Sequence, residues 1–289
     1  MFRSERMAMN RFWHIEVNVT PNDQVVSVAH YVDPWYEMSA RLAVQPLDYR
    51  VEEASVEVLR TPQGKVGATS LKLESLRGAI AYLGVGKRIK MATHEDDSGL
   101  QAGLLLECVK ALRQARLFVW ERYGIDPAEH LDLIRRLMMD SCIYFTTPES
   151  LNAVLEPVQL QEMKRWDCLF SRHKYCLMEE ASGVDNVTVG WSDSYHEMQI
   201  RLAVQGDEVS SLEGAILRAP HDECFGAERT LPLLMGACYT EGAGDWERRL
   251  AGPKGCTHLA DLAREALTSV SYWRWVRQEL TRAQGSQGG

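Results

Sequence analysis

An internal repeat is the feature that most constrains the fold of this chain. Residues 37–45 read EMSARLAVQ and residues 197–205 read EMQIRLAVQ, so seven of the nine positions are identical. An aspartate, Asp33 or Asp193, precedes each segment by four residues, and LRTP ending at Pro62 corresponds to LRAP ending at Pro220. Self-similarity of this kind predicts two copies of one structural unit in tandem.

The two copies together predict the fold class. In residues 198–204 the apolar side chains alternate with polar ones, as in a half-buried strand. Strands are also expected within 11–32, 172–192 and 209–217, and helices over 226–235 and 257–281. The predicted fold is α+β, a tandem duplication of a β-β-β-α-α domain with helices on one face of an antiparallel sheet. The predicted domains are a first repeat (1–124), a helical connector (125–167), a second repeat (168–283) and a disordered tail (284–289).

Charge and cysteine usage restrict the function classes. The chain has 289 residues and a net charge of -8, which disfavours nucleic acid as a partner. No apolar run is long enough to span a membrane, and no secretory signal is present at the N-terminus. Seven cysteines, an odd count in a long chain, favour a reduced, cytoplasmic protein over a disulfide framework. We expect a small-molecule substrate, an internal pseudo-dimer of the repeats and a possible homodimer.

The second repeat carries a set of residues suited to chemistry. Cys256 and His258 lie in GCTHL at the expected start of the last helix, where the helix dipole lowers the pKa of a thiol. Cys224 follows Pro220 before another helical segment, and His196 begins the central strand. Because all of these positions are element termini, the sequence predicts that they converge.

The first repeat has lost this set. Tyr36 stands at the position of His196, Val66 at that of Cys224, and SGLQAGL (98–104) replaces the GCTHL segment. The joint loss favours one shared site in the second repeat. The alternative is that the cysteines are inert core residues, and that Glu197 and Arg201 form a structural ion pair, since Glu37 and Arg41 recur in the first repeat. The remaining cysteines, including Cys142, and His221 are assigned to packing and loops.

Two resemblances follow from these motifs. The motifs APHDEC (219–224), LPLLMG (231–236) and GCTHLADL (255–262) resemble an uncharacterised bacterial family, a domain of unknown function with the GCTHL signature. The order of elements also distantly resembles the iron–sulfur scaffold fold of the NifU and IscU type, although the first cysteine of that family and its Cys-Gly-Asp loop are missing. That second resemblance implies that the element termini meet at a site of metal size.

The leading functional hypothesis is a catabolic enzyme with a metal site. His196, Cys224 and Cys256, with Asp193 as a further ligand, would hold Zn²⁺ for lyase or hydrolase chemistry on a carbonyl compound, possibly an aromatic one. The predicted catalytic residues are Glu197 as general base, Arg201 for substrate binding, and His258. No residue is assigned to an organic cofactor. Two alternatives stay open, namely a scaffold or carrier for a metal or an iron–sulfur cluster, and a metal-free enzyme with a cysteine nucleophile.

Overall fold

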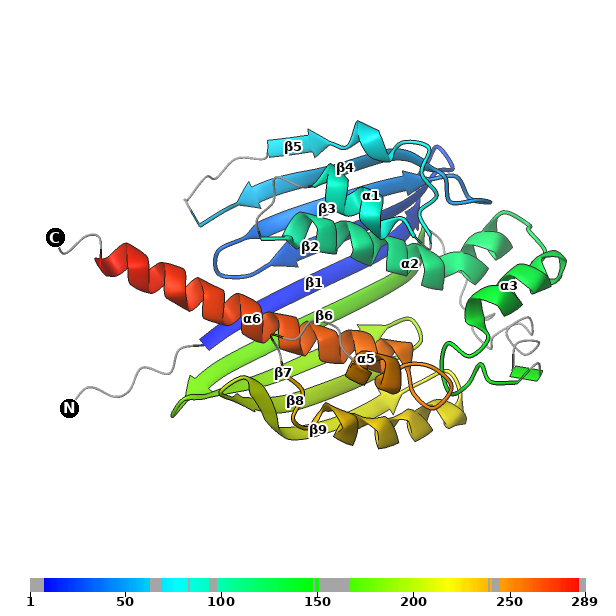
Figure 1. Cartoon of the computed structure of the whole chain (residues 1–289). Helices are drawn as coiled ribbons and strands as arrows, with labels where there is room; N and C mark the ends of the chain where they lie inside the picture. Colours follow the sequence, from blue (N-terminus) through cyan, green and yellow to red (C-terminus); the bar gives the residue numbers. More distant parts are fainter. Residues whose placement is uncertain are drawn as a thin grey trace. The chain divides into compact units, whose positions relative to one another are not determined.

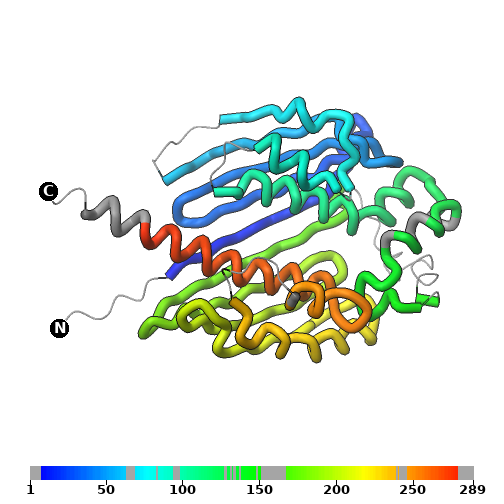
Figure 2. Tube along the Cα trace, in the orientation of Figure 1, coloured from blue at the N-terminus to red at the C-terminus, as the bar shows by residue number. Residues whose placement is uncertain are grey.

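The structure is a computed structural model that describes residues 8–62, 69–82, 84–93, 98–147, 149–150, 167–238, 240 and 245–285 (Figure 1, Figure 2). Within these ranges the chain divides into two compact units. The first comprises residues 11–132 and 167–174, and the second comprises residues 8–10, 133–150 and 175–285. Residues 133–147 of the predicted connector therefore lie in the unit that holds the second half of the chain.

Strands dominate both halves of the sequence. The strands are β1 (Ala8–Val19), β2 (Val25–Val32), β3 (Glu37–Val44), β4 (Val51–Arg60), β5 (Thr69–Lys72), β6 (Cys168–Ala181), β7 (Val184–Asp193), β8 (Glu197–Gln205) and β9 (Glu208–Arg218). They form a nine-stranded sheet in the order β5-β4-β3-β2-β1-β6-β7-β8-β9. Each strand pair with an assigned register is antiparallel.

The helices follow the strands in each half. They are η1 (Glu74–Leu76), α1 (Gly86–Ala92), α2 (Leu100–Arg122), η2 (Pro127–His130), α3 (Leu131–Met138), η4 (Asp222–Leu234), α5 (Asp245–Leu250) and α6 (Thr257–Gly285). The segment predicted as a helix over 226–235 is a 3-10 helix, and it contains Pro232, which cannot donate a backbone hydrogen bond. No described helix is long and apolar enough to cross a membrane.

The first unit packs α2 on β2 and β3 (Figure 1). Buried charge accompanies the apolar core. The carboxylate of Glu107 lies 3.1 Å from Lys110, 3.1 Å from Arg172 and 3.3 Å from Lys174. Burial alone would raise the pKa of Glu107, but these three cations hold it well below its usual range.

The second unit packs α6 on β7 and β8. Along β8 the side chains of Met198, Ile200, Leu202 and Val204 are buried and those between them are more exposed, so the period-two prediction for this strand is confirmed. The predicted tail begins inside α6, which continues to Gly285. The rest of that tail, residues 286–289, lies outside the described residues.

The predicted fold class is wrong. The chain is not a tandem β-β-β-α-α duplication, because its strands join one nine-stranded sheet, with five strands from the first half and four from the second. Periodicity identifies strands but not their pairing partners. The long strands β1 and β6 lie next to each other in the sheet, and hydrogen bonds between distant parts of the chain decide that order.

Candidate active site

The site begins at a tight turn between β7 and β8. The side chain of Asp193 is completely buried there. Its Oδ1 accepts hydrogen bonds from the backbone N–H groups of Tyr195 (2.8 Å) and His196 (2.7 Å). Its Oδ2 accepts one from the indole Nε1 of Trp191 (2.8 Å). The turn is thus closed by a carboxylate that stands in for missing backbone acceptors.

Asp193 also orients an imidazole. The Nδ1 atom of His196 lies 3.2 Å from Asp193 Oδ1, so the ring carries its proton on Nδ1 when neutral and presents Nε2 to its surroundings. The ring of His196 is buried and meets the ring of His258 at a centroid distance of 4.1 Å. Trp191 packs edge-on against His258 at 5.6 Å. Residues from β7, β8 and α6 therefore converge.

The thiol of Cys256 completes this chain of contacts. Its Sγ lies 3.8 Å from His258 Nδ1, within hydrogen-bond distance for sulfur, and the residue is 6% exposed. The sequence predicted a lowered thiol pKa at this helix start. Instead, burial raises the pKa of Cys256 to about 11, which outweighs the hydrogen bonds from the backbone N–H groups of His258 and Leu259. At neutral pH this group is a thiol next to a base.

Two further cysteines lie near Cys256. Burial raises the pKa of Cys224 to about 12, and the neighbouring Cys142 and Cys256 raise it further because adjacent thiolates repel. Cys142 likewise raises the pKa of Cys256. Cys142, from the segment that was predicted to be a connector, therefore influences the pKa of both Cys224 and Cys256, and Cys256 influences that of Cys224.

A short segment between α3 and the second half covers these groups. We call residues 140–146 the strap. The carbonyl of Ser141 accepts hydrogen bonds from Thr257 Oγ1 (2.7 Å) and from Gly252 N (3.2 Å), and Ile143 N donates to Gly255 O (2.8 Å). The strap is therefore hydrogen-bonded to the first residue of α6 and to the glycines that precede this helix.

The strap also contacts the start of η4. The ring of Tyr144 stacks on the ring of His221 with centroids 3.6 Å apart and planes at 5°. Burial lowers the pKa of His221, and the nearby His196 lowers it as well. Contacts thus lead from Asp193 through His196 and His258 to Cys256. The strap adds Cys142 and the stacked Tyr144–His221 pair beside them.

Two of the predicted catalytic residues lie elsewhere. Glu197 and Arg201 are on the exposed face of β8, whereas Met198 and Ile200 face the core. Arg201 reaches Glu213 on β9 only at 3.9 Å, with both side chains largely exposed. Alternation along a strand places these two side chains on the face opposite to the buried set, so the structure does not bring them to Cys256 and His258.

The predicted metal ligands do not form a complete ligand set in the part of the chain that the structure describes. Among the residues described, no three His, Cys, Asp or Glu side chains are grouped so as to hold a metal ion. The buried Asp193 already accepts hydrogen bonds through both oxygens, so it serves as a support for His196. Carboxylate-supported histidines are common beside metals, and the same arrangement also orients catalytic bases.

Sequence reasoning missed Cys142, Tyr144 and His221 as members of the site. Cys142 and His221 were assigned to packing and to a loop because neither belongs to a repeated motif. The only sequence signal was the aromatic and cysteine content of CIYF at 142–145, directly before the Thr147-Pro148 break. Its place over the site depends on long-range hydrogen bonds.

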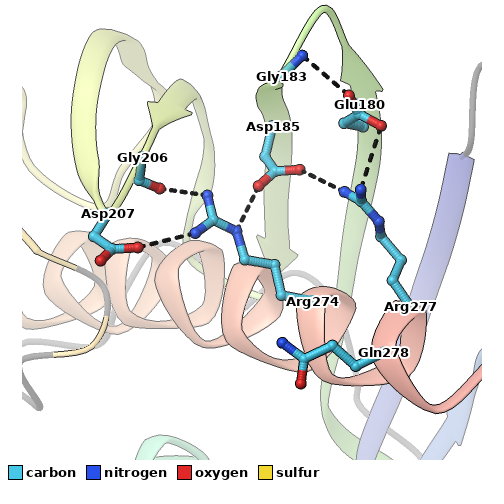
Figure 3. A pocket seen from close by; sticks show the side chains of 8 residues that line it. All are labelled: Glu180, Gly183, Asp185, Gly206, Asp207, Arg274, Arg277 and Gln278. Atoms are coloured by element: carbon cyan, nitrogen blue, oxygen red, sulfur yellow. Dashed lines mark hydrogen bonds and ion pairs between the residues drawn. The ribbon is translucent and has the colours of Figure 1, made fainter. Parts of the chain in front are cut away.

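A separate pocket of about 560 Å³ lies near the opposite end of the strands in the second unit (Figure 3). Arg274 on α6 binds Asp185 (2.7 Å) and Asp207 (3.1 Å), and Arg277 lies 3.5 Å from both Asp185 and Glu180. Helical rise separates Arg274 from His258 by about 24 Å along α6. This ion-pair network fastens α6 to the two hairpin turns.

The comparisons with known proteins find one family match, in the second half of the chain. Residues 177–271 match a family described as "Protein of unknown function (DUF2889)". The matched range contains Asp193, His196, Cys224, Cys256 and His258, but not the strap. No curated protein and no solved structure matches the chain.

Proposed function

We propose that the second unit is an enzyme for a small carbonyl compound, with Cys256 as its nucleophile. The observation that carries the proposal is the continuous contact from Cys256 Sγ to His258 (3.8 Å), from His258 to His196, and from His196 to Asp193 (3.2 Å). A nucleophile, a base and a buried carboxylate that orients the base are the components of thiol-dependent acyl transfer.

The raised pKa of Cys256 determines how such a step would run. Because the thiol is protonated at neutral pH, its proton must pass to His258 Nδ1 while sulfur attacks the carbonyl carbon. The protonated His258 then gives this proton to the leaving group as its bond to carbon breaks. Water hydrolyses the resulting thioester and restores the thiol. The negative charge of Asp193 stabilises the transient positive charge on the imidazole pair.

A second candidate is a metal-dependent lyase or hydrolase, or a metal carrier, at the same place. It is supported by the electrostatic influence of Cys142 on both Cys224 and Cys256, because thiolates that lie close enough to repel each other would be stabilised by a divalent cation such as Zn²⁺. A rearrangement of side chains would be needed, since the described residues hold no ready-made ligand set. His196, with its carboxylate support, would be the nitrogen ligand. The GCTHL segment supplies Cys256 and His258 in either version.

The test is hydrolysis of a panel of esters and thioesters by the wild-type protein and by Cys256→Ser, His258→Ala and Cys238→Ser, with metal content measured on each sample. We expect Cys256→Ser and His258→Ala to lose activity by about a hundredfold or more. Cys238 is the matched control, because its Sγ lies 2.9 Å from Thr240 Oγ1 and outside the site.

Full activity in Cys256→Ser would overturn the nucleophile. About one zinc per chain that disappears in Cys256→Ser would establish the metal version. Iron with sulfide would establish the carrier.

A further inference from the structure

The strap is bonded to the two neighbours of Cys256 in the chain, Gly255 and Thr257, and it stacks on His221 through Tyr144. Cys256 is 6% exposed and Tyr144 is 9% exposed, so neither a substrate nor a reagent reaches the thiol without a displacement of side chains. The covering residues belong to a segment that the family match at 177–271 does not include.

The contacts that hold the strap are few and polar at one end and aromatic at the other. Three hydrogen bonds join Ser141 and Ile143 to the residues before α6. The stacked ring of Tyr144 joins the strap to His221. A single substitution can remove the Thr257 hydrogen bond or the Tyr144 ring stack, so the contribution of each to the closed position can be measured separately.

The strap begins at a residue with unusual backbone geometry. Asp140 has φ of +58°, in the left-handed region that non-glycine residues rarely adopt. Its N–H donates to the carbonyl of Phe145 at 2.7 Å, which closes the strap into a compact loop. Strained backbone at the base of a loop over a reactive group is typical of segments that move as a unit.

We propose that the strap is the gate of the Cys256 site, and that the Tyr144–His221 stack and the Thr257–Ser141 hydrogen bond keep it closed. The role of the gate in catalysis rests on the proposed function, whereas the control of access to the Cys256 thiol does not. When the strap moves away, it uncovers the face of His221 and the thiols of Cys224 and Cys256. It also carries Cys142, a strap residue, away from Cys256.

The experiment measures iodoacetamide alkylation of each cysteine by peptide mass spectrometry on the full chain. Thr257→Val removes the hydroxyl that binds Ser141 and preserves the shape of the side chain. Tyr144→Ala removes the stacked ring, and Tyr144→Phe keeps it. Thr268→Val is the matched control on the same helix, since Thr268 Oγ1 bonds only within α6, to Arg264 O and Glu265 O.

We expect Thr257→Val and Tyr144→Ala to raise the alkylation rate of Cys256 about fivefold, the effect of one ordinary hydrogen bond or ring stack. Tyr144→Phe and Thr268→Val should match the wild type. Rates are expressed relative to Cys108, which is fully buried in the first unit, so that global unfolding cancels. An unchanged Cys256-to-Cys108 ratio in both Thr257→Val and Tyr144→Ala would overturn the gate. Loss of the proposed nucleophile role would appear separately, as full activity in Cys256→Ser.

Discussion

The turns at Asp33 and Asp193 have the same construction in the two halves of the chain. In the first, Asp33 Oδ1 accepts the backbone N–H groups of Trp35 (2.7 Å) and Tyr36 (2.6 Å), as Asp193 Oδ1 does with the corresponding residues. An arginine donates to the backbone carbonyl of the turn aspartate in both halves. Arg60 bonds to Asp33 O at 2.5 Å, and Arg218 bonds to Asp193 O at 2.7 Å. The aspartate and its arginine are therefore part of the scaffold.

The difference lies in what surrounds each aspartate. The second oxygen of Asp33 accepts the hydroxyl of Tyr31 at 2.6 Å, and that hydroxyl also accepts from Arg11 Nε at 2.9 Å. At Asp193 the corresponding donor is the indole of Trp191, and His196 replaces Tyr36. The comparison shows that both halves keep the same turn, whereas His196, Cys224, Cys256 and His258 have no counterparts in the first half. We therefore expect the shared Asp193 to support the proposed site and the unshared residues to carry its chemistry.

The largest effect is expected from making the second turn resemble the first. His196→Tyr introduces the residue that the first turn already accommodates at Tyr36, so the fold should persist. Activity against the best substrate of the ester and thioester panel should fall by about a hundredfold or more, because His258 loses its imidazole partner and the link to Asp193. Steady-state kinetics with a circular-dichroism melt would check this. A folded His196→Tyr protein with the kcat/KM of the wild type would show that His196 has no part in the reaction.

The next effect is on stability and should be similar in the two turns. Asp33→Ala leaves two backbone N–H groups and the Tyr31 hydroxyl without this acceptor, and Asp193→Ala leaves two backbone N–H groups, the Trp191 indole and the His196 ring without theirs. We expect each to lower the free energy of unfolding by about 3 kcal/mol. Urea denaturation measures both. If one substitution lowers the free energy of unfolding by less than about 1 kcal/mol, the aspartate of that turn does not stabilise the fold as its counterpart does.

A smaller effect is expected from pH. Burial lowers the pKa of His173 in the first unit and of His221 in the second, and the neighbouring histidines His14 and His196 add to this. A folded-state pKa below the unfolded value of about 6.5 means that the unfolded chain takes up protons more readily, so stability is complete above that pH and falls below it.

The variants His173→Gln and His221→Gln should each reduce the stability lost between pH 7.5 and pH 5.5. The reduction should be below about 1 kcal/mol, since both side chains are partly exposed. Urea midpoints at the two pH values, compared with the wild type, give the answer. A variant that loses as much stability as the wild type would show that its histidine does not contribute.

The smallest effects belong to the shared arginines of the central strands. Arg41 lies 2.7 Å from Glu53, and Arg201 lies 3.9 Å from Glu213 with 64% of its side chain exposed. Arg41→Ala should cost about 0.5 kcal/mol and Arg201→Ala less, because exposed ion pairs are weak. Arg201→Ala should also keep its activity. A loss of more than about tenfold would return Arg201 to the site, where sequence reasoning had placed it.

Local rules explain which features were predictable from the sequence. The alternation from Met198 to Val204 predicted β8, and Thr257 marked the start of the long helix, because side-chain periodicity and helix boundaries depend on neighbours in the chain. The prediction that Cys224 and Cys256 share one site stays a prediction, and Cys256 is one of the groups that raise the pKa of Cys224.

The amino-acid sequence by itself therefore determined the strand β8, the start of the long helix α6, and that His196, Cys224, Cys256 and His258 belong to the second repeat alone. Only the tertiary structure decided that nine strands form one sheet, that burial raises the pKa of Cys256 despite its place at a helix start, and that Glu197 faces away from it. It also decided that the strap lies over the site. The physical reason is that pairing order, desolvation and cover depend on contacts between residues far apart in the chain, which local periodicity does not encode.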